Sequence, residues 1–300
     1  MYTNLLIPLD GSTTAEKVLP YGRSLAGKLG IPVELIGIVD IAAMATHMAA
    51  EKARYLDAFI AAGERSSDDY LKRIAKTFPG QSVKCSVAKG RPEEAIIEKA
   101  AAEKGTLIAM ATHGRSGINR WLLGSVAEKV LRGTANPLLL VRATEHVDTV
   151  GEANLKSVVV PLDGSKLAES VLPSATSLAK LLNLEVILLR AYDLPATAYY
   201  GSEDYLPNYE ELKSRLKDEA RSYLETMVTA LKLEGLAKVT PVLMEGSGAD
   251  EIISFARKNP DTLVAMCTHG RSGVKRWVLG SVTEKVVRHS DDPVLVVRGN

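Results

Sequence analysis

A glycine-containing loop that occurs twice carries the residues best suited to holding an anionic ligand. It spans Gly114–Ser125 and recurs as Gly270–Ser281, each time with the spacing Gly-x9-Gly-Ser. Glycine lets backbone N–H groups approach an anion without a Cβ in the way, and a helix that opens at the serine offers a phosphate the positive end of its dipole. A plainer interpretation stays open, because Ser125 with Glu128 also fits a capping box, which needs no ligand.

Polar side chains beside these loops could add ligand contacts. Asp10 and Asp163 each follow a strand-like segment and precede a helix-like one. Each is therefore either a hydrogen-bond partner of a ligand or part of an Asx turn. His113 and His269 precede the glycine loops, and each contacts either a phosphate or ribose group or a backbone carbonyl. Arg115 either pairs with a phosphate or lies on a solvated surface.

Several better-known site motifs are absent from the sequence. There is no Gly-Lys-Ser/Thr of a Walker A loop and no Gly-x-Gly-x-x-Gly. Ser116 is not a nucleophile elbow, because Ile118 stands where the second glycine should be. The histidines away from the loops have no partners at metal-ligand spacing; they are His47, His146 and His289. We therefore expect no catalytic residues and no metal site.

The sequence is a tandem repeat. Ile7–Ser12, IPLDGS, recurs as Val160–Ser165, VPLDGS, and Ala111–Arg132 recurs almost unchanged as Cys267–Arg288. A repeat unit of about 150 residues is far longer than the units of solenoids, so the pattern indicates domain duplication. We expect one domain over residues 1–145 and a second over 155–300, joined by the polar stretch Ala143–Leu155.

Each copy alternates strand-like and helix-like segments. Strands are expected in the first copy at Asn4–Leu9, Val33–Val39, Val83–Ala88, Thr106–Ala111 and Leu138–Val141. Helices are expected after Ser12 or Thr13 up to Gly30, over Met48–Lys76, from Pro92, and over Ser125–Arg132. Alternation of this kind requires parallel strands with right-handed crossovers, which is a doubly wound, Rossmann-like α/β fold with five strands per domain. Ligands of such folds lie at the carboxyl ends of the strands.

Taken together, the Pro-x-Asp-Gly-Ser and Gly-x9-Gly-Ser motifs resemble those of the universal stress protein family over essentially the whole chain. The resemblance implies a five-stranded α/β fold that pairs through its last strand. Many members bind ATP with a Gly-x2-Gly-x9-Gly-Ser/Thr loop. The expected ligand is accordingly ATP, or ADP or AMP, with or without Mg²⁺.

The resemblance also implies two sets of binding residues. In the first copy they are Pro8, Leu9, Asp10, Ile38, Met110, Ala111, His113, Gly114, Arg115, Gly124, Ser125 and Val126. In the second copy they are Pro161, Leu162, Asp163, Ala191, Met266, Cys267, His269, Gly270, Arg271, Gly280, Ser281 and Val282. One departure concerns the family's first glycine, which is Ala111 here and Cys267 in the second copy. Because a cysteine side chain intrudes further than a methyl group, we expect the first site to bind more tightly.

Composition narrows the functional classes. The net charge of +1 gives no field that would attract nucleic acid, and no apolar run reaches the ~18 residues of a membrane span. Two cysteines far apart fit a reducing compartment, so a cytoplasmic location is expected. The last strands, Leu138–Val141 and Val294–Val297, are expected to meet, either as a pseudo-dimer within the chain or across a homodimer.

The sequence therefore predicts a stress-response protein that senses or regulates by binding a nucleotide. Two alternatives stay open at this point. One is a slow ATPase or adenylyl-transfer enzyme on the same fold. The other is an interaction module without nucleotide, in which the loops serve only helix capping and packing.

Overall fold

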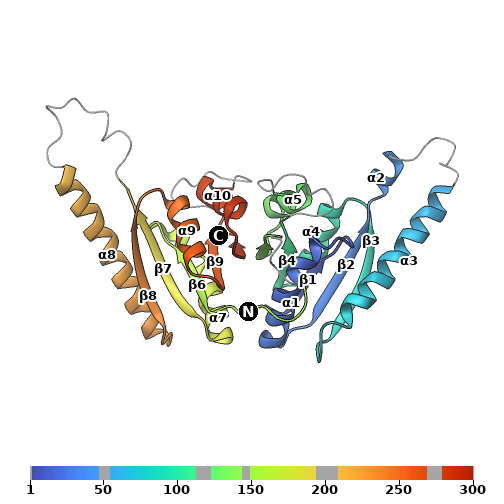
Figure 1. The fold of residues 1–300 in the computed structure, drawn as a ribbon, viewed down its shortest axis with the longest axis horizontal. Helices are drawn as coiled ribbons and strands as arrows, with labels where there is room; N and C mark the ends of the chain where they lie inside the picture. The colour runs from blue at the N-terminus through green and yellow to red at the C-terminus, as the bar shows by residue number, and fades with distance from the viewer. Residues whose placement is uncertain are drawn as a thin grey trace. The chain divides into compact units, whose positions relative to one another are not determined.

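The computed structural model describes residues 2–46, 55–112, 123–143, 149–193, 209–268 and 279–299. The chain divides into two compact units, Met1–Asn154 and Leu155–Asn300 (Figure 1). Each unit holds one copy of the sequence repeat.

The first unit is a five-stranded parallel sheet with the strand order β3-β2-β1-β4-β5. Its strands are β1 Asn4–Pro8, β2 Val33–Val39, β3 Val83–Lys89, β4 Thr106–Ala111 and β5 Leu138–Val141. Its helices are η1 Ala15–Val18, α1 Leu19–Leu29, α2 Ile41–Thr46, α3 Leu56–Ala75, α4 Pro92–Ala102 and α5 Ser125–Gly133. Strands β1, β4 and β5 are buried along their whole length, as expected of parallel strands covered on both faces.

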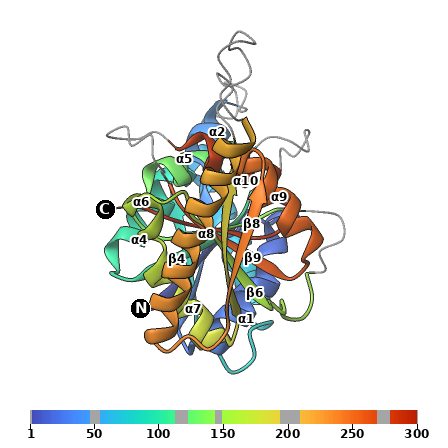
Figure 2. The same cartoon turned by 90° about the vertical axis from the view of Figure 1, so that its left-hand side faces the viewer.

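The second unit repeats this plan with the order β8-β7-β6-β9-β10, again parallel. Its strands are β6 Ser157–Pro161, β7 Glu185–Tyr192, β8 Val239–Glu245, β9 Thr262–Cys267 and β10 Val294–Val297. Its helices are α6 Lys166–Glu169, α7 Leu172–Leu182, α8 Tyr209–Leu233, α9 Gly248–Lys258 and α10 Ser281–His289. Figure 2 looks onto the long helix α8, which packs on β7 and β8. The expectation of two doubly wound five-stranded domains is confirmed.

Two helix predictions need correction. The helix expected to run unbroken up to Gly30 is split into η1 and α1, because Pro20 lacks an N–H and sits in the first turn of a new helix. The helix expected over Met48–Lys76 begins instead at Leu56, as α3, with Tyr55 as its N-cap; residues 47–54 lie outside the described residues. The short helix α2 was not expected, although Asp40 caps it by accepting a hydrogen bond from the Ala43 N–H at 2.9 Å.

A left-handed residue ends the first long helix of each domain. Gly30 closes α1 with φ 63°, and its N–H donates to the carbonyl of Ala26. Asn183 closes α7 in the same way, with φ 53° and a bond to Ala179. Glycine and asparagine are the residues that best tolerate this conformation, so the two sequences specify one turn with different side chains.

The first domain has a buried polar cluster on β2. The Glu34 side chain is 6% exposed and accepts a hydrogen bond from Ser86 Oγ at 2.9 Å. Its carboxylate also pairs with Lys99 Nζ of α4 at 2.9 Å. The corresponding residue on β7 is Ile187, which is buried. The same buried position is therefore occupied by an ion-paired side chain in the first domain and by an apolar side chain in the second.

The residues after β5 are tied to the first domain by Arg23. The Arg23 residue, 5% exposed on α1, donates to the carbonyl of Gly151 at 2.6 Å and to that of Thr149 at 2.5 Å. It also donates to Thr77 Oγ1 at 3.1 Å and lies 5.7 Å from the ring centroid of Phe78. These contacts fix residues 149–151 on the surface of the first domain.

Candidate functional site

A pocket of about 280 Å³ opens at the carboxyl ends of the strands in the second domain. Its walls come from β6, β7 and β9 and from the first residues of α9 and α10. The lining residues are Pro161, Leu162, Asp163, Ala168, Leu189, Ala191, Gly248, Ile252, Met266, Cys267, Gly280, Ser281, Val282 and Thr283. This is the place where ligands bind in doubly wound sheets.

Every sequence-predicted residue of the second site that the structure describes lines this pocket. His269, Gly270 and Arg271 lie outside the described residues. Sequence reasoning missed five lining residues: Ala168, Leu189, Gly248, Ile252 and Thr283. Leu189 could have been found, because side chains two apart on a strand share a face and Ala191 was already assigned.

The first domain arranges the equivalent residues in the same way. Pro8 ends β1, Ile38 lies near the end of β2, and Met110 and Ala111 end β4. Leu9 and Asp10 directly follow β1, and Gly124, Ser125 and Val126 form the start of α5. The remaining predicted residues, His113, Gly114 and Arg115, lie outside the described residues.

Both aspartates adopt the Asx-turn geometry. Asp10 Oδ1 accepts hydrogen bonds from the backbone N–H of Ser12 at 2.9 Å and from its hydroxyl at 2.5 Å. Asp163 Oδ1 binds Ser165 in the same way, at 2.9 and 2.6 Å. Each serine hydroxyl then accepts from a backbone N–H three residues later at 3.1 Å, and in the second domain this bond makes Ser165 the N-cap of α6. One carboxylate oxygen of each aspartate therefore holds the turn that forms one wall of the site.

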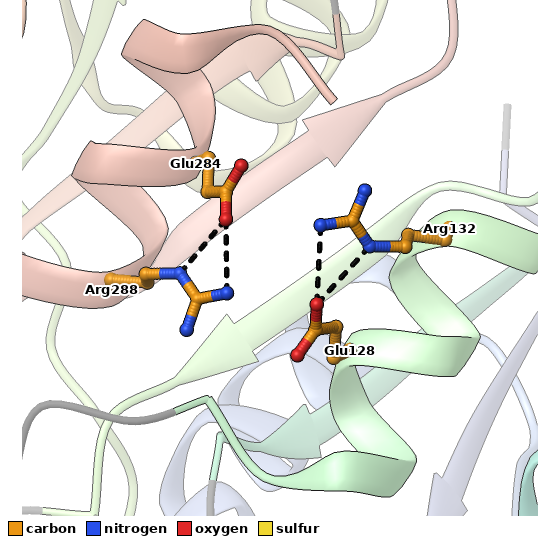
Figure 3. A network of polar contacts seen from close by, with 4 residues as sticks. All are labelled: Glu128, Arg132, Glu284 and Arg288. Carbon is orange, nitrogen blue, oxygen red and sulfur yellow. Dashed lines mark hydrogen bonds and ion pairs between the residues drawn. The ribbon is translucent and has the colours of Figure 1, made fainter. Parts of the chain in front are cut away.

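The capping box that stayed open as the plainer interpretation of Ser125 and Glu128 does not form. The N-cap of α5 is Gly124, whose side chain cannot cap, and Glu128 instead accepts two hydrogen bonds from Arg132, at 3.1 and 3.2 Å. The second domain repeats this with Gly280 as N-cap of α10 and with a matching carboxylate–guanidinium pair, Glu284–Arg288 (Figure 3). A glycine N-cap leaves the first N–H groups of a helix without a side-chain partner. In the second domain this helix end faces the pocket.

Hydrogen bonds close the base of each glycine loop. In the first domain, the Gly124 N–H donates to the carbonyl of Thr112 at 2.6 Å. In the second, the Gly280 N–H donates to the carbonyl of Thr268 at 2.8 Å. The N–H of each threonine donates in turn to the last strand of its domain, at 2.9 Å. The glycine that caps each helix is therefore linked, through the threonine, to the last strand of its domain.

A tyrosine–glutamate hydrogen bond also recurs beside each site. Tyr70 of α3 donates to Glu16 Oε1 at 3.0 Å, and Tyr223 of α8 donates to Glu169 Oε1 at 3.0 Å. Burial and the nearby carboxylate raise the pKa of both phenols well above its usual range. In the second domain the guanidinium of Arg190 stacks on Tyr223, 4.8 Å from the ring centroid. The bond holds the long helix against the short helix that carries the pocket residue Ala168.

The wall formed by β7 and α9 contains smaller side chains in the second domain than its counterpart does in the first. Ala191 stands where the first domain has Ile38, and Gly248 stands where it has Pro92. On the opposite wall, Cys267 is 5% exposed and its Sγ accepts a hydrogen bond from Ser170 Oγ at 3.3 Å. The expected crowding of a ligand by Cys267 stays a prediction.

Among the residues that the structure describes, no group of three or more His, Cys, Asp or Glu side chains could hold a metal ion. Within the same residues, no helix is both long and apolar enough to cross a membrane. Cys85 and Cys267 are both free thiols.

Comparisons with known proteins agree with the repeat. The sequence model of the universal stress protein family matches residues 1–142 and again residues 154–298. A universal stress protein of Methanocaldococcus jannaschii is 32% identical over 148 residues, which is 49% of this chain and 85% of that protein. A universal stress protein of Mycobacterium tuberculosis is 22% identical over 298 residues, 98% of this chain and 96% of that protein.

The fold comparison gives the same result. The crystal structure of a universal stress protein from Archaeoglobus fulgidus superposes with a TM-score of 0.70 at 22% identity, over 98% of both chains. At this identity the likeness shows the fold alone. The family match in both halves goes further: the chain belongs to the universal stress protein family and contains two of its domains in tandem.

Proposed function

We propose that the pocket of the second domain binds an adenine nucleotide, and that the protein acts as a sensor or regulator through this binding. One observation carries the proposal: the pocket unites all nine described residues that the family motifs predict with the uncapped start of α10. Phosphates would lie on the N–H groups of Gly280, Ser281 and Val282, where the helix dipole favours negative charge. The base would lie against Ala191 and the end of β6.

The apolar lining supports a planar, largely apolar group at the other end of the pocket. Leu162, Leu189 and Ile252 are almost fully buried, whereas Val282 is 41% exposed at the pocket wall. Ligand sites commonly combine such apolar walls with a few fixed polar groups. Here those groups are the Asp163 turn and the hydroxyl of Ser281, whereas the Thr283 hydroxyl donates to the carbonyl of Cys267 at 2.9 Å.

Binding is favoured over turnover by the chemistry of the lining. Among the described lining residues, the ionisable side chains are Asp163 and Cys267. One oxygen of Asp163 is already bonded to Ser165, and the Cys267 thiol is bonded to Ser170. Neither is set up as a general base for a water molecule. Slow hydrolysis of ATP is therefore the second candidate function. It is tested by measuring the release of phosphate from ATP with the same protein samples.

We propose that the pocket of the second domain has more room for a ligand than the equivalent place in the first domain. Comparison of Ala111 with Cys267 favours the first domain, but Ala191 and Gly248 leave more space than Ile38 and Pro92 do on the other wall. In the first domain the equivalent residues would form a second site of smaller capacity. A cytoplasmic location fits the two free cysteines.

The test is calorimetry on the purified, nucleotide-stripped full chain with ATP, ADP and AMP, each with and without Mg²⁺. Gly280→Val should abolish binding in the second domain, because its side chain blocks the approach of a phosphate to the helix start. Gly124→Val is the matched variant and should affect the first domain only. Absence of heat and of thermal stabilisation with millimolar ATP would overturn the proposal. Steady phosphate release would favour the enzyme.

A further inference from the structure

The turn that leads into the last strand is the same in both domains but carries a different side chain. In the first domain, the Asn136 N–H donates to Thr134 Oγ1 at 3.0 Å. In the second, the Asp292 N–H donates to Ser290 Oγ at 3.2 Å. The two backbones therefore bring residues 136 and 292 to equivalent places, at the amino ends of the strands and away from the pocket.

Asn136 uses its amide hydrogens to join two elements. Its Nδ2 donates to the carbonyl of Ala100 in α4 at 3.0 Å and to the carbonyl of Thr106 in β4 at 3.1 Å. The equivalent carbonyls in the second domain belong to Ala256 and Thr262, both of which are almost completely buried. A carboxylate has no hydrogen to donate to them, whereas a protonated carboxyl group has one.

Negative charge gathers around Asp292. Asp291 precedes it, and Asp261 lies in the loop before β9; the first domain has Ala135 and Gly105 there. Arg257 of α9 pairs with Asp291 at 3.5 Å, and Lys156 pairs with Asp261 at 2.7 Å. Burial, reinforced by Asp291 and Asp261 and opposed by Arg257, raises the pKa of Asp292 to about 7.

We propose that Asp292 is a pH-sensing residue, which ties the turn before β10 to the carbonyl of Ala256 or Thr262 through one O–H hydrogen bond when its carboxyl is protonated and releases it when the carboxyl ionises. This inference is independent of the nucleotide site. An unfolded aspartic acid ionises near pH 4, so between about pH 4 and pH 7 the folded domain retains a proton that the unfolded chain has lost. The stabilisation is complete below about pH 4 and is lost as the pH rises through about 7.

The test is hydrogen–deuterium exchange of the full chain, read from peptides that cover residues 254–264 and 290–296. Exchange times are scaled for the intrinsic dependence on pH. In the wild type, the opening of these segments should increase by about tenfold between about pH 5.5 and pH 8, which corresponds to one pKa unit after allowance for partial solvent exposure. In Asp292→Asn the opening should stay low at both values, as an amide donates at any pH.

The first domain supplies the reciprocal variant. Asn136→Asp should make the opening of residues 98–108 and 134–140 sensitive to pH in the same direction. If this variant fails to fold at neutral pH, recovery of its fold at about pH 5 supports the inference equally. Two results would overturn it: a pH dependence in Asp292→Asn equal to that of the wild type, or lower protection in that variant at acid pH.

Discussion

Replacing Ala191 with isoleucine should fill the part of the second-domain pocket where the adenine base is proposed to lie. The cavity of about 280 Å³ is just below the ~300–1,000 Å³ typical of ligand sites, so it has little space to spare. Isoleucine adds three carbon atoms at a wall where Leu189 and Ile252 are already buried. Overpacking of this kind costs about 1–3 kcal/mol, which corresponds to about a tenfold to hundredfold rise in Kd for an adenine nucleotide.

The assay is calorimetric titration in a Gly124→Val background, so that the heat reports the second domain. Ala191→Val should give an intermediate Kd, and Ile38→Ala, made with Gly280→Val, should tighten binding in the first domain. Thermal unfolding of each variant controls for loss of fold. A Kd for Ala191→Ile within about twofold of its parent, in a folded protein, corresponds to less than about 0.5 kcal/mol. Such a result would show that no base lies against this wall.

Three further substitutions test interactions described above by urea unfolding or proteolysis. Lys99→Met leaves the buried Glu34 carboxylate short of a partner and should lower the unfolding free energy by about 2–3 kcal/mol; an unchanged urea midpoint would show that the ion pair is dispensable. Tyr223→Phe removes the hydrogen bond to Glu169 and should cost about 1–2 kcal/mol, with equal stability refuting its role. Arg23→Met removes two bonds to backbone carbonyls and should speed proteolytic cleavage within residues 143–155, whereas unchanged cleavage would contradict this.

The central strands of each sheet could be predicted from the sequence because they are buried on both faces. Three expected strands agree with the structure at both ends: Val33–Val39, Thr106–Ala111 and Leu138–Val141. Each is an unbroken apolar or nearly apolar run, for which burial alone decides the conformation. The strands of the second domain could be predicted in the same way, because its sequence repeats that of the first.

Features that depend on contacts between distant segments were harder to predict. Local spacing favoured a capping box at Glu128, but Arg132 one turn later competes for the carboxylate. The lining residues Gly248 and Ile252 come from α9, and no local pattern shows which helix end faces the pocket. The meeting of the last strands stays a prediction.

The closed base of each glycine loop has a consequence for engineering. Because Thr112 and Gly124 are hydrogen-bonded to each other, as are Thr268 and Gly280, the two residues that flank each glycine loop are held next to one another. The entropic cost of closing a loop grows only slowly with its length. We therefore expect that the intervening segments can be exchanged between the two domains or replaced by segments of other lengths. Such changes should leave the preceding strand and the following helix in place.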